Sequence, residues 1–418
     1  MKTLFLILSL LALFSVSYAD NYGTILQLTD IHYDQLYEKG APATCWFAEK
    51  VGLRCCRKYD ISIAPHRKAE EYGDFDCDTP YSLVELTFEW LSKNNVSEYP
   101  LDFVFWTGDT AGHHDITQSF DFNMEAVAKV TALMEKHLPD TRVIPAIGNH
   151  DTWPIDQLAP PNPNSTKVTE TLNQLWSNWL SPRMIHTFYY GGYYTTKILD
   201  NLRLVVVNCL YEDKNNLLDK FSKDPAYQYK WLNQTLFDAE KVGEEVWIVG
   251  HIFPSAGEGT SKFTSFMEDL TNRYSSTIKY QFFGHSHDDE FRVYLDKNQD
   301  PSGFLFVSPS LMPDKHHPQF RAYVYDRETY EIVDYYQFYA NLTKINDGTD
   351  MNYHLLYKAK ESYGLENMDA ESWFNLVDRM KSNSTLLDMY NTWFSYRYPL
   401  KQCTGTCPNS TIKSLLLS

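Results

Sequence analysis

Five stretches of this chain run from a short apolar segment directly into residues that bind metal ions. The apolar segments are rich in β-branched and aromatic residues, which is typical of strands buried in a sheet. They lead into Asp30-Ile31-His32, Gly108-Asp109 with His113 four residues further on, Gly148-Asn149-His150-Asp151, Gly250-His251 and Gly284-His285-Ser286-His287. Because the carboxyl ends of strands in an α/β sheet open on one crevice, we expect all five groups to meet there.

Strand-like and helix-like segments alternate along the chain, which predicts α/β layers. The expected strands are residues 24–29, 103–107, 143–147, 202–208, 246–249, 280–283 and 304–308. The expected helices are 83–93 capped by Ser82, 124–138, and 226–240 entered through Asp224-Pro225. Residues 159–166 have loop composition, and we expect antiparallel edge strands, for example 304–308 beside 321–325. After Asn341 we expect no strand, only aromatic-bearing helices at 372–381 and 386–394.

The beginning of the chain predicts export. Met1-Lys2 precedes an apolar run, and Ser17-Tyr18-Ala19 forms a small-residue cleavage site, so we interpret residues 1–19 as a signal peptide. In an oxidising compartment, the cysteines between Cys45 and Cys77 are expected to form two disulfides, with the pairing left open, and Cys403 and Cys407 a third. Cys209 is then expected to be a buried free thiol. Export also agrees with six N-glycosylation sequons, at Asn95, Asn164, Asn233, Asn341, Asn383 and Asn409.

The charge balance disfavours one class of binding partner. Lys and Arg total 37 against 54 Asp and Glu, a formal net charge of −17, which disfavours binding to nucleic acid polymers. Hydrophobic residues make up 43% of the chain, enough to build a core and to exclude a disordered protein. No internal stretch approaches the ~18 consecutive apolar residues of a membrane span.

The side chains at the strand ends define the chemistry. Oxygen and imidazole donors are supplied, without thiolates, by Asp30, His32, Asp109, Asn149, His251, His285 and His287. Since one carboxylate can bridge two ions, this set predicts a dinuclear site for zinc or another borderline divalent metal. Two such ions activate a hydroxide and clamp the oxygens of a displacement at phosphorus.

With these motifs in the same order, the chain resembles the calcineurin-type metallophosphoesterases. More narrowly, it resembles the acid sphingomyelinase-like phosphodiesterases, through residues 29–34, Trp106-Thr107-Gly108-Asp109, residues 145–151 with Trp153-Pro154, residues 282–287 and the aromatic helical tail. The resemblance implies a layered β-sandwich flanked by helices, with a C-terminal helical appendage. The implied domains are the signal peptide 1–19, a catalytic domain 20–340 and a disulfide-closed helical domain 341–418. A saposin-like lipid-handling domain, which acid sphingomyelinase carries before its catalytic domain, does not fit between Ala19 and Asp30.

The resemblance also implies roles for individual residues. The first zinc ion is assigned to Asp30, His32, Asp109 and His287, and the second to Asp109, Asn149, His251 and His285. His113 and His150 are then the catalytic histidines, which protonate the leaving oxygen and stabilise the charge on the phosphoryl group. We choose His113 over the adjacent His114 because the family's histidine lies four residues after the bridging aspartate. We interpret His316-His317, outside these motifs, as loop histidines.

The leading functional hypothesis is a zinc phosphodiesterase, secreted or in the lumen of lysosomes or endosomes, that uses a metal-bound hydroxide to hydrolyse sphingomyelin to ceramide and phosphocholine. This hypothesis includes peripheral contact with a membrane surface. The alternative with the same site is a phosphodiesterase that acts on soluble nucleotides or CDP-choline, which the missing saposin-like domain favours. A glycoprotein that binds metal without turnover is a third reading, and the complete set of ligands argues against it.

Overall fold

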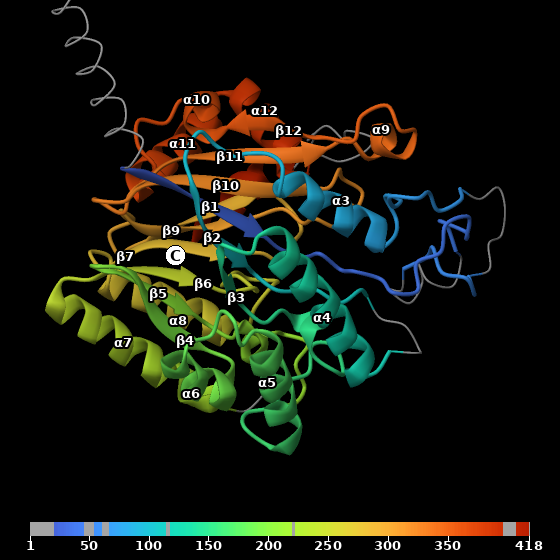
Figure 1. The fold of residues 1–418 in the computed structure, drawn as a ribbon. Coiled ribbons are helices and arrows are strands. Elements are labelled where there is room, and N and C mark those ends of the chain that lie inside the picture. Colours follow the sequence, from blue (N-terminus) through green and yellow to red (C-terminus); the bar gives the residue numbers. More distant parts are fainter. Residues whose placement is uncertain are drawn as a thin grey trace, which may run out of the picture.

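Two β-sheets face each other at the centre of the structure, a computed structural model that describes residues 21–45, 54–60, 67–113, 118–219, 222–395 and 407–417. In these residues, the first sheet has the order β12 (Tyr353–Lys358), β11 (Ile332–Ala340), β10 (Gln319–Asp326), β1 (Tyr22–Leu28), β2 (Leu101–Trp106) and β3 (Arg142–Pro145). The second has the order β13 (Leu416–Leu417), β8 (Glu290–Leu295), β9 (Pro301–Val307), β7 (Ile278–Phe283), β6 (Glu245–Val249), β5 (Leu202–Val206) and β4 (Tyr194–Leu199). Figure 1 shows the two sheets stacked, which confirms the predicted layered α/β fold.

Parallel strands form one end of the first sheet and the centre of the second. β1, β2 and β3 pair in parallel, as do β5, β6, β7 and β9. β10 pairs antiparallel with β1, and β4 and β8 pair antiparallel with β5 and β9. The turns that follow β2 and β6 touch, because His251 Nδ1 lies 2.7 Å from the carbonyl oxygen of Thr107. The carboxyl ends of parallel strands from both sheets therefore open on the same region.

Aromatic side chains fill the space between the sheets. Phe105 packs against Trp247 and Phe282, with ring centroids 6.5 and 5.1 Å apart, and Phe282 meets Tyr323 at 5.0 Å. All four rings are buried, so this interface provides much of the apolar area that stabilises the fold.

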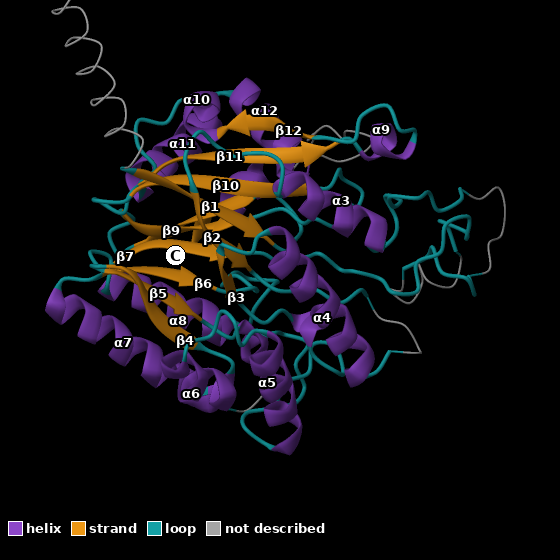
Figure 2. Ribbon diagram, in the orientation of Figure 1, coloured by secondary structure: helices purple, strands orange, loops and turns teal. Residues whose placement is uncertain are grey.

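Helices cover the outer faces of the sheets (Figure 2). In the described residues these are α3 (Tyr81–Leu91), α4 (Phe120–His137), α5 (Pro163–Leu175), α6 (Pro182–Gly191), α7 (Gln228–Val242), α8 (Ser261–Arg273), α9 (Leu342–Asn346), α10 (Ala359–Tyr363), α11 (Ala370–Ser382), α12 (Ser384–Ser395) and α13 (Cys407–Ser414). Short 3₁₀ helices lie at η1 (Asn149–Asp151), η2 (Cys209–Glu212) and η3 (Pro225–Tyr227). α7 and α8 place Leu232 and Met267 in one cluster with Ile248 of β6. No helix among the described residues is long and apolar enough to cross a membrane.

The predicted strands exist within a few residues of their expected bounds, but two expectations about strands are wrong. Residues 304–308 and 321–325 do not pair, since β9 and β10 belong to different sheets. The segment after Asn341 does contain strands, because β12 pairs with β11 and β13 with β8. In β12, Tyr353 and Tyr357 are buried while Leu355 is 44% exposed, and this irregular alternation hides the strand period in the sequence.

The helix boundaries correct three further expectations. Ser82 is not the cap of its helix: α3 begins at Tyr81 after Pro80, and the Ser82 hydroxyl donates to the carbonyl of Glu71. Residues 159–166 are not all loop, because α5 begins at Pro163, and proline is well tolerated in the first turn of a helix. Asp224-Pro225 does not open the helix at residue 226 as predicted, because Ala226 and Tyr227 have positive φ angles of 49° and 53° and α7 begins at Gln228. The Asp224 carboxylate still accepts from the backbone N–H groups of Tyr229 and Lys230 in the first turn of α7.

The cysteines pair as Cys45–Cys55 and Cys56–Cys77, which confirms two disulfides in this region and resolves their connectivity. Cys209 is buried and free, as expected. The predicted Cys403–Cys407 bond and the signal peptide lie outside the described residues.

The C-terminal helices pack onto β8 and β9, the strands that come after the loop with His285 and His287. Trp373 of α11 is fully buried and meets Phe291 of β8 and Phe306 of β9, with centroids 4.5 and 5.5 Å apart. After α11, the carbonyl of Phe394 accepts a 2.6 Å hydrogen bond from the backbone N–H of Asp289, two residues beyond His287. The helices therefore brace the loop that contains His285 and His287.

Replacing Trp373 by alanine should lower the free energy of unfolding by about 3–5 kcal/mol, because it removes a buried aromatic side chain from a packed interface. Chemical denaturation would measure the loss. Phe374→Ala, at the half-buried neighbouring position on the same helix, is the matched control and should cost less. Equal costs for the two variants would contradict this packing.

Candidate active site

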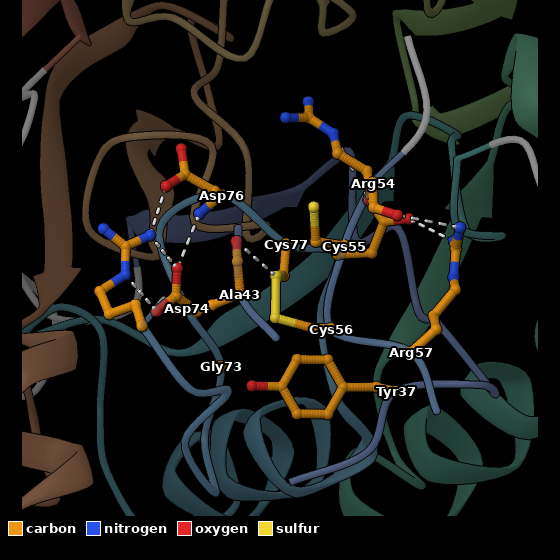
Figure 3. Close-up of a disulfide and its surroundings, with 12 residues drawn as sticks. Tyr37, Ala43, Arg54, Cys55, Cys56, Arg57, Gly73, Asp74, Asp76 and Cys77 are labelled. Carbon is orange, nitrogen blue, oxygen red and sulfur yellow. Dashed lines mark hydrogen bonds and ion pairs between the residues drawn. A yellow bond between two sulfur atoms is a disulfide. The ribbon is translucent and has the colours of Figure 1, made fainter. Parts of the chain in front are cut away.

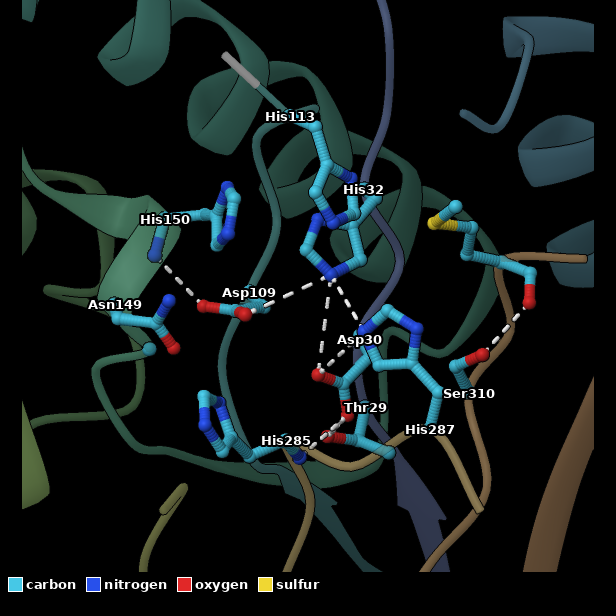
Figure 4. Close-up of polar contacts among 12 residues, drawn as sticks. Thr29, Asp30, His32, Asp109, His113, Asn149, His150, His285, His287 and Ser310 are labelled. Carbon is cyan, nitrogen blue, oxygen red and sulfur yellow. Dashed lines mark hydrogen bonds and ion pairs between the residues drawn. The ribbon is translucent and has the colours of Figure 1, made fainter. Parts of the chain in front are cut away.

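The structure brings all seven predicted ligands and both predicted catalytic histidines together. Figure 4 labels all of them except His251. Asp30 and His32 follow β1, Asp109 follows β2 and Asn149 follows β3. His251 follows β6, and His285 and His287 follow β7. The first sheet therefore supplies one half of the site and the second sheet the other, which the sequence does not indicate.

Left-handed backbone conformations position five of the seven predicted metal ligands. The positive φ angles are 49° at Asp30, 44° at His32, 56° at Asp109, 82° at His285 and 65° at His287. Such angles cost non-glycine residues of the order of 1–3 kcal/mol each and concentrate at functional sites. Here they turn successive side chains off the strand ends, and hydrogen bonds such as His32 N to Asp109 O, at 3.0 Å, hold the turns.

Two glycines permit the close approach of these turns. Gly108 has a φ of +94°, and a Cβ there would lie 2.5 Å from Gly148 N. A Cβ on Gly148 would lie 2.2 Å from Asp109 Oδ1. Any larger residue at either position would displace the Asp109 carboxylate, so the motif needs glycine for space as well as for conformation.

One group of ligand atoms gathers around His32 Nε2. This nitrogen lies 3.0 Å from His287 Nε2, 3.6 Å from Asp109 Oδ2 and 3.9 Å from Asp30 Oδ1. The same Asp30 oxygen lies 3.5 Å from His287 Nε2. Asp30 Oδ1 is buried and accepts no hydrogen bond from any described residue.

A second group gathers around His251 Nε2 and shares the Asp109 carboxylate. His251 Nε2 lies 2.8 Å from Asn149 Oδ1, 3.1 Å from Asp109 Oδ2 and 3.3 Å from His285 Nδ1. Asp109 Oδ2 therefore contacts both groups. Its other oxygen, Oδ1, accepts a 2.8 Å hydrogen bond from the backbone N–H of His150.

In each of these four histidines, the ring nitrogen that does not belong to a ligand group faces an oxygen atom. The pairs are His32 Nδ1 with Ala111 O at 3.1 Å, His251 Nδ1 with Thr107 O at 2.7 Å, His287 Nδ1 with Asp314 Oδ2 at 3.3 Å, and His285 Nε2 with Glu258 Oε2 at 3.5 Å. An acceptor at one nitrogen keeps the proton there and leaves the other nitrogen with a lone pair, as in metal-ligating histidines.

These residues fit a pair of divalent metal ions. Two ligand atoms at about 2.0–2.1 Å from one tetrahedral zinc ion lie about 3.3–3.4 Å apart, close to the spacings within each group. Imidazole nitrogens that face one another at 3.0 and 3.3 Å, and the unpartnered Asp30 oxygen, are what such ions would satisfy. The donor set is nitrogen and oxygen only, which suits zinc and similar borderline cations.

The protonation of the histidines makes metal binding depend on pH. Burial lowers the pKa of His32 well below its usual value and that of His285 to about 3, so both rings are neutral as a metal requires. Burial acts in the same direction on the other two, but Asp109 raises the pKa of His251 to about 9, and the two carboxylates beside His287 raise its pKa to about 10. Metal ions must displace protons from these two rings, so their affinity falls as the pH falls.

The two histidines predicted to be catalytic lie beside the first group. The His113 ring stacks on His32 at 4.2 Å between centroids, and the His150 ring meets His32 edge-on at 4.7 Å. His113 Nδ1 lies 2.6 Å from Asp78 Oδ1, which leaves Nε2 for other partners. His114 lies outside the described residues.

Several carboxylates that hold this arrangement were not predicted as site residues. Asp151 accepts from the backbone N–H groups of Gly148, Asp109 and Thr110 at 2.8–3.1 Å and so joins two of the turns. Asp156 accepts from Asn149 Nδ2 at 2.8 Å, which aims Asn149 Oδ1 at His251. Asp151 is visible at the end of its motif, whereas Asp78, Asp314 and Glu258 lie far in sequence from the histidines they contact. His316 and His317 are buried and hydrogen-bonded, and both lie outside the two groups.

A family model described as calcineurin-like phosphoesterase matches residues 23–289, which include all nine predicted site residues. The chain belongs to this family. A second model, described as the acid sphingomyelin phosphodiesterase C-terminal region, matches residues 302–417. Together the two matches confirm the resemblance to acid sphingomyelinase-like phosphodiesterases.

Relatives in this family differ in the substrates that their names print. Sphingomyelin phosphodiesterase A of Dictyostelium discoideum is 34% identical over 94% of this chain and 66% of its own length, and Sphingomyelinase phosphodiesterase C of the same organism is 31% identical over 94% and 90%. The human Cyclic GMP-AMP phosphodiesterase SMPDL3A is 30% identical over 92% of this chain and 85% of its own length. The chain thus spans less than two thirds of the length of several of these relatives, for example 62% of the human Sphingomyelin phosphodiesterase.

Replacing Asp109 by asparagine should weaken the binding of both metal ions. An outer partner of a ligand is typically worth 10–100-fold in metal affinity, and Asp109 contacts both groups directly, so we expect a loss of at least about 100-fold. Elemental analysis of protein purified without chelators measures this, with close to two zinc ions per chain expected for the unmodified protein. The control is Asp378→Asn, an exposed aspartate on α11, which should keep both ions. Full metal content in Asp109→Asn would show that the two groups do not share this carboxylate.

Proposed function

We propose that this chain is a dinuclear zinc phosphodiesterase. The observation that carries this proposal is the shared Asp109 oxygen between two groups of ligand atoms, each built from histidine nitrogens and carboxylate or amide oxygens. The first ion would be held by Asp30, His32, Asp109 and His287, and the second by Asp109, Asn149, His251 and His285. When bound, the two ions would activate a water molecule for attack at phosphorus and neutralise the charge on the phosphate oxygens.

His113 is the proposed general acid. Asp78, fully buried, holds its Nδ1 at 2.6 Å and accepts from its backbone N–H at 2.7 Å, so the ring has a fixed orientation with Nε2 available to the leaving oxygen. The Asp78 carboxylate also compensates the positive charge that the ring carries when both of its nitrogens are protonated.

His150 is the residue that we propose to act on the phosphoryl group. Burial lowers its pKa to about 4, so the ring is neutral at most pH values and donates one N–H. Its backbone N–H is already bound to Asp109, and its ring meets the His113 ring at 4.6 Å. We assign it to stabilising the charge that builds up on the phosphoryl oxygens.

His113→Ala should lower turnover of a substrate with an alkoxide leaving group by about 10²–10⁴-fold, because general acid catalysis typically contributes that much. A p-nitrophenyl phosphodiester needs little protonation of its leaving group and should lose far less. His150→Ala should slow both substrates alike, and both variants should keep two zinc ions. His354→Ala, an exposed histidine paired with Asp350, is the control. A His113→Ala variant that slowed both substrates equally, or that lost zinc, would refute the role proposed for His113.

We propose sphingomyelin as the substrate, cleaved to ceramide and phosphocholine. Support comes from relatives named for this activity and from two exposed leucines that hydrogen bonds link to Asn149 through residues 156 and 157. Leu217 and Leu218 are 64% and 57% exposed, and the backbone N–H of Leu217 donates to Gln157, the neighbour of the Asp156 that holds Asn149. Apolar side chains at this position can enter a lipid surface that presents the phosphodiester.

The second candidate is a soluble phosphodiester, either a nucleotide or CDP-choline. It is favoured by the similarity to the human Cyclic GMP-AMP phosphodiesterase SMPDL3A, of which this chain covers 85%. The same metal ligands and histidines would serve both substrates, since the chemistry at phosphorus is identical.

A substrate panel separates the two candidates. We expect sphingomyelin in phosphatidylcholine vesicles to be turned over faster than cyclic GMP-AMP or CDP-choline. The double variant Leu217→Ser with Leu218→Ser should lower turnover on vesicles by at least about 100-fold, since burial of each leucine is worth about 1.5–3 kcal/mol, and leave a soluble p-nitrophenyl phosphodiester unaffected. Val242→Ser, at an equally exposed position at the end of α7, should change neither. Faster turnover of a nucleotide or of CDP-choline would reject sphingomyelin.

Secretion, or delivery to a lysosomal or endosomal lumen, is part of this proposal. Two disulfides lie in the described residues, and such bonds persist in oxidising compartments. Asn95, Asn233, Asn383 and Asn409 are exposed and could carry glycans. The Asn341 side chain is half-buried and accepts from Lys344 N at the start of α9.

A further inference from the structure

The two disulfides meet at adjacent cysteines, and an arginine lies on each side of them. Cys55 is bonded back to Cys45 and Cys56 forward to Cys77, so the sequence Arg54-Cys55-Cys56-Arg57 is tied to the protein in both directions. Figure 3 shows the Cys56–Cys77 bond with Cys55 beside it. Arg57 Nη1 lies 3.4 Å from the carbonyl oxygen of Arg54, which closes the turn. Both arginine side chains leave this turn toward the active site.

Arg57 reaches the carboxylate that holds His113. Its Nη2 donates to Asp78 Oδ2 at 3.2 Å and to the carbonyl of His113 at 3.0 Å. Its Nε donates to Asp34 Oδ2 at 2.7 Å, two residues after His32. The Arg57 side chain is only 4% exposed, so one buried guanidinium joins the segments that carry His32 and His113.

Arg54 reaches the carboxylate that faces His287. Its Nη1 donates to Asp314 Oδ1 at 3.0 Å, and the other oxygen of Asp314 lies 3.3 Å from His287 Nδ1. Arg54 Nε also lies 3.9 Å from Asp78 Oδ1. With its side chain 19% exposed, Arg54 is a partly buried link between the disulfide turn and a predicted metal ligand.

Buried ion pairs of this kind are a weak source of stability, because desolvation of the charges offsets their attraction. Their value lies in geometry: a guanidinium donates in a fixed plane and can hold two carboxylates in place. Here the carboxylates are those that orient one proposed acid and one proposed ligand. The two arginines thus reach two different functions of the site from one cross-linked turn.

We propose that Arg54 and Arg57 are positioning residues for the active site, held by the paired disulfides at Cys55 and Cys56. Arg57 acts through Asp78 on the orientation of His113, and Arg54 acts through Asp314 on His287 and the first metal ion. This inference rests on the proposed function for the role of His113, whereas the part that concerns Arg54 can be measured on metal binding alone.

Substitution of the two arginines should change two different quantities, turnover for Arg57 and zinc affinity for Arg54. Arg57→Met should lower turnover of sphingomyelin by about 10–100-fold, leave the p-nitrophenyl phosphodiester within about threefold, and keep two zinc ions bound, since the acid is misplaced and the ligands are not. Arg54→Met should lower the affinity of the metal-free protein for zinc by about 10–100-fold, measured by competition with a zinc chelator, the range expected when an outer partner of a ligand is lost. Arg57→Lys keeps the charge and one donor and should recover part of the lost turnover.

The matched control is Arg67→Met, an arginine between Cys56 and Cys77. Arg67 is half-exposed and pairs with Asp74 at 2.6 Å and with Asp76. Neither of these carboxylates belongs to the site. This variant should keep the turnover and the zinc affinity of the unmodified protein. A fall in Arg67→Met equal to that in the other two would show that the segment only contributes to folding, and would overturn the proposal.

A double-variant cycle decides whether Arg57 acts through His113. If it does, adding Arg57→Met to His113→Ala should cost nothing further in sphingomyelin turnover, and the two losses will not add. Additive losses would overturn this part of the proposal, and unchanged zinc affinity in Arg54→Met would overturn the other. Should Arg57→Met not fold, the cycle is run with Arg57→Lys. An unmodified protein that binds two zinc ions and hydrolyses neither phosphodiester would refute the proposed function and leave the zinc measurement on Arg54 valid.

Discussion

The Asp109 carboxylate is the point on which the two halves of the site depend. Oδ2 lies within 3.6 Å of His32 Nε2 on one side and 3.1 Å of His251 Nε2 on the other. A buried carboxylate surrounded by ring nitrogens is costly unless positive charge compensates it, and the two proposed metal ions would supply that charge. The left-handed turn at Asp109 and the glycines around it place the oxygen where both groups can share it. The left-handed turn at Asp109 and the glycines beside it are therefore required by the position of this one oxygen atom.

Three separate parts of the fold hold the side chains around Asp109 in place. The parallel strands of both sheets deliver the ligands, the C-terminal helices brace the loop after His287 through Asp289, and the disulfide turn at Cys55-Cys56 reaches the carboxylates that hold His113 and His287. Each support arises from a different part of the sequence. Rigid elements with several attachments can hold side chains to the tolerance that phosphoryl chemistry requires.

The gathering of these side chains could be predicted from the sequence because each group begins within four residues of the end of a short strand, and a glycine precedes four of the five groups. Both the strand and the glycine are local features. The partners of those ligands could not be predicted in this way. Asp78 contacts His113 across a separation of 35 residues, and no local pattern links the two. The pairing of strands was missed for the same reason: periodicity describes β9 and β10 individually, but not that they belong to different sheets. In β12, exposed Leu355 breaks the alternation on which strand prediction relies.

The most direct test of the shared carboxylate is diffraction from crystals of the protein purified without chelators, with data collected on both sides of the zinc absorption edge. Anomalous difference maps should show two peaks about 3.5–4 Å apart, with Asp109 between them. His113 and His150 should coordinate neither peak. A single peak, or two peaks that Asp109 does not bridge, would contradict a dinuclear site built on this residue.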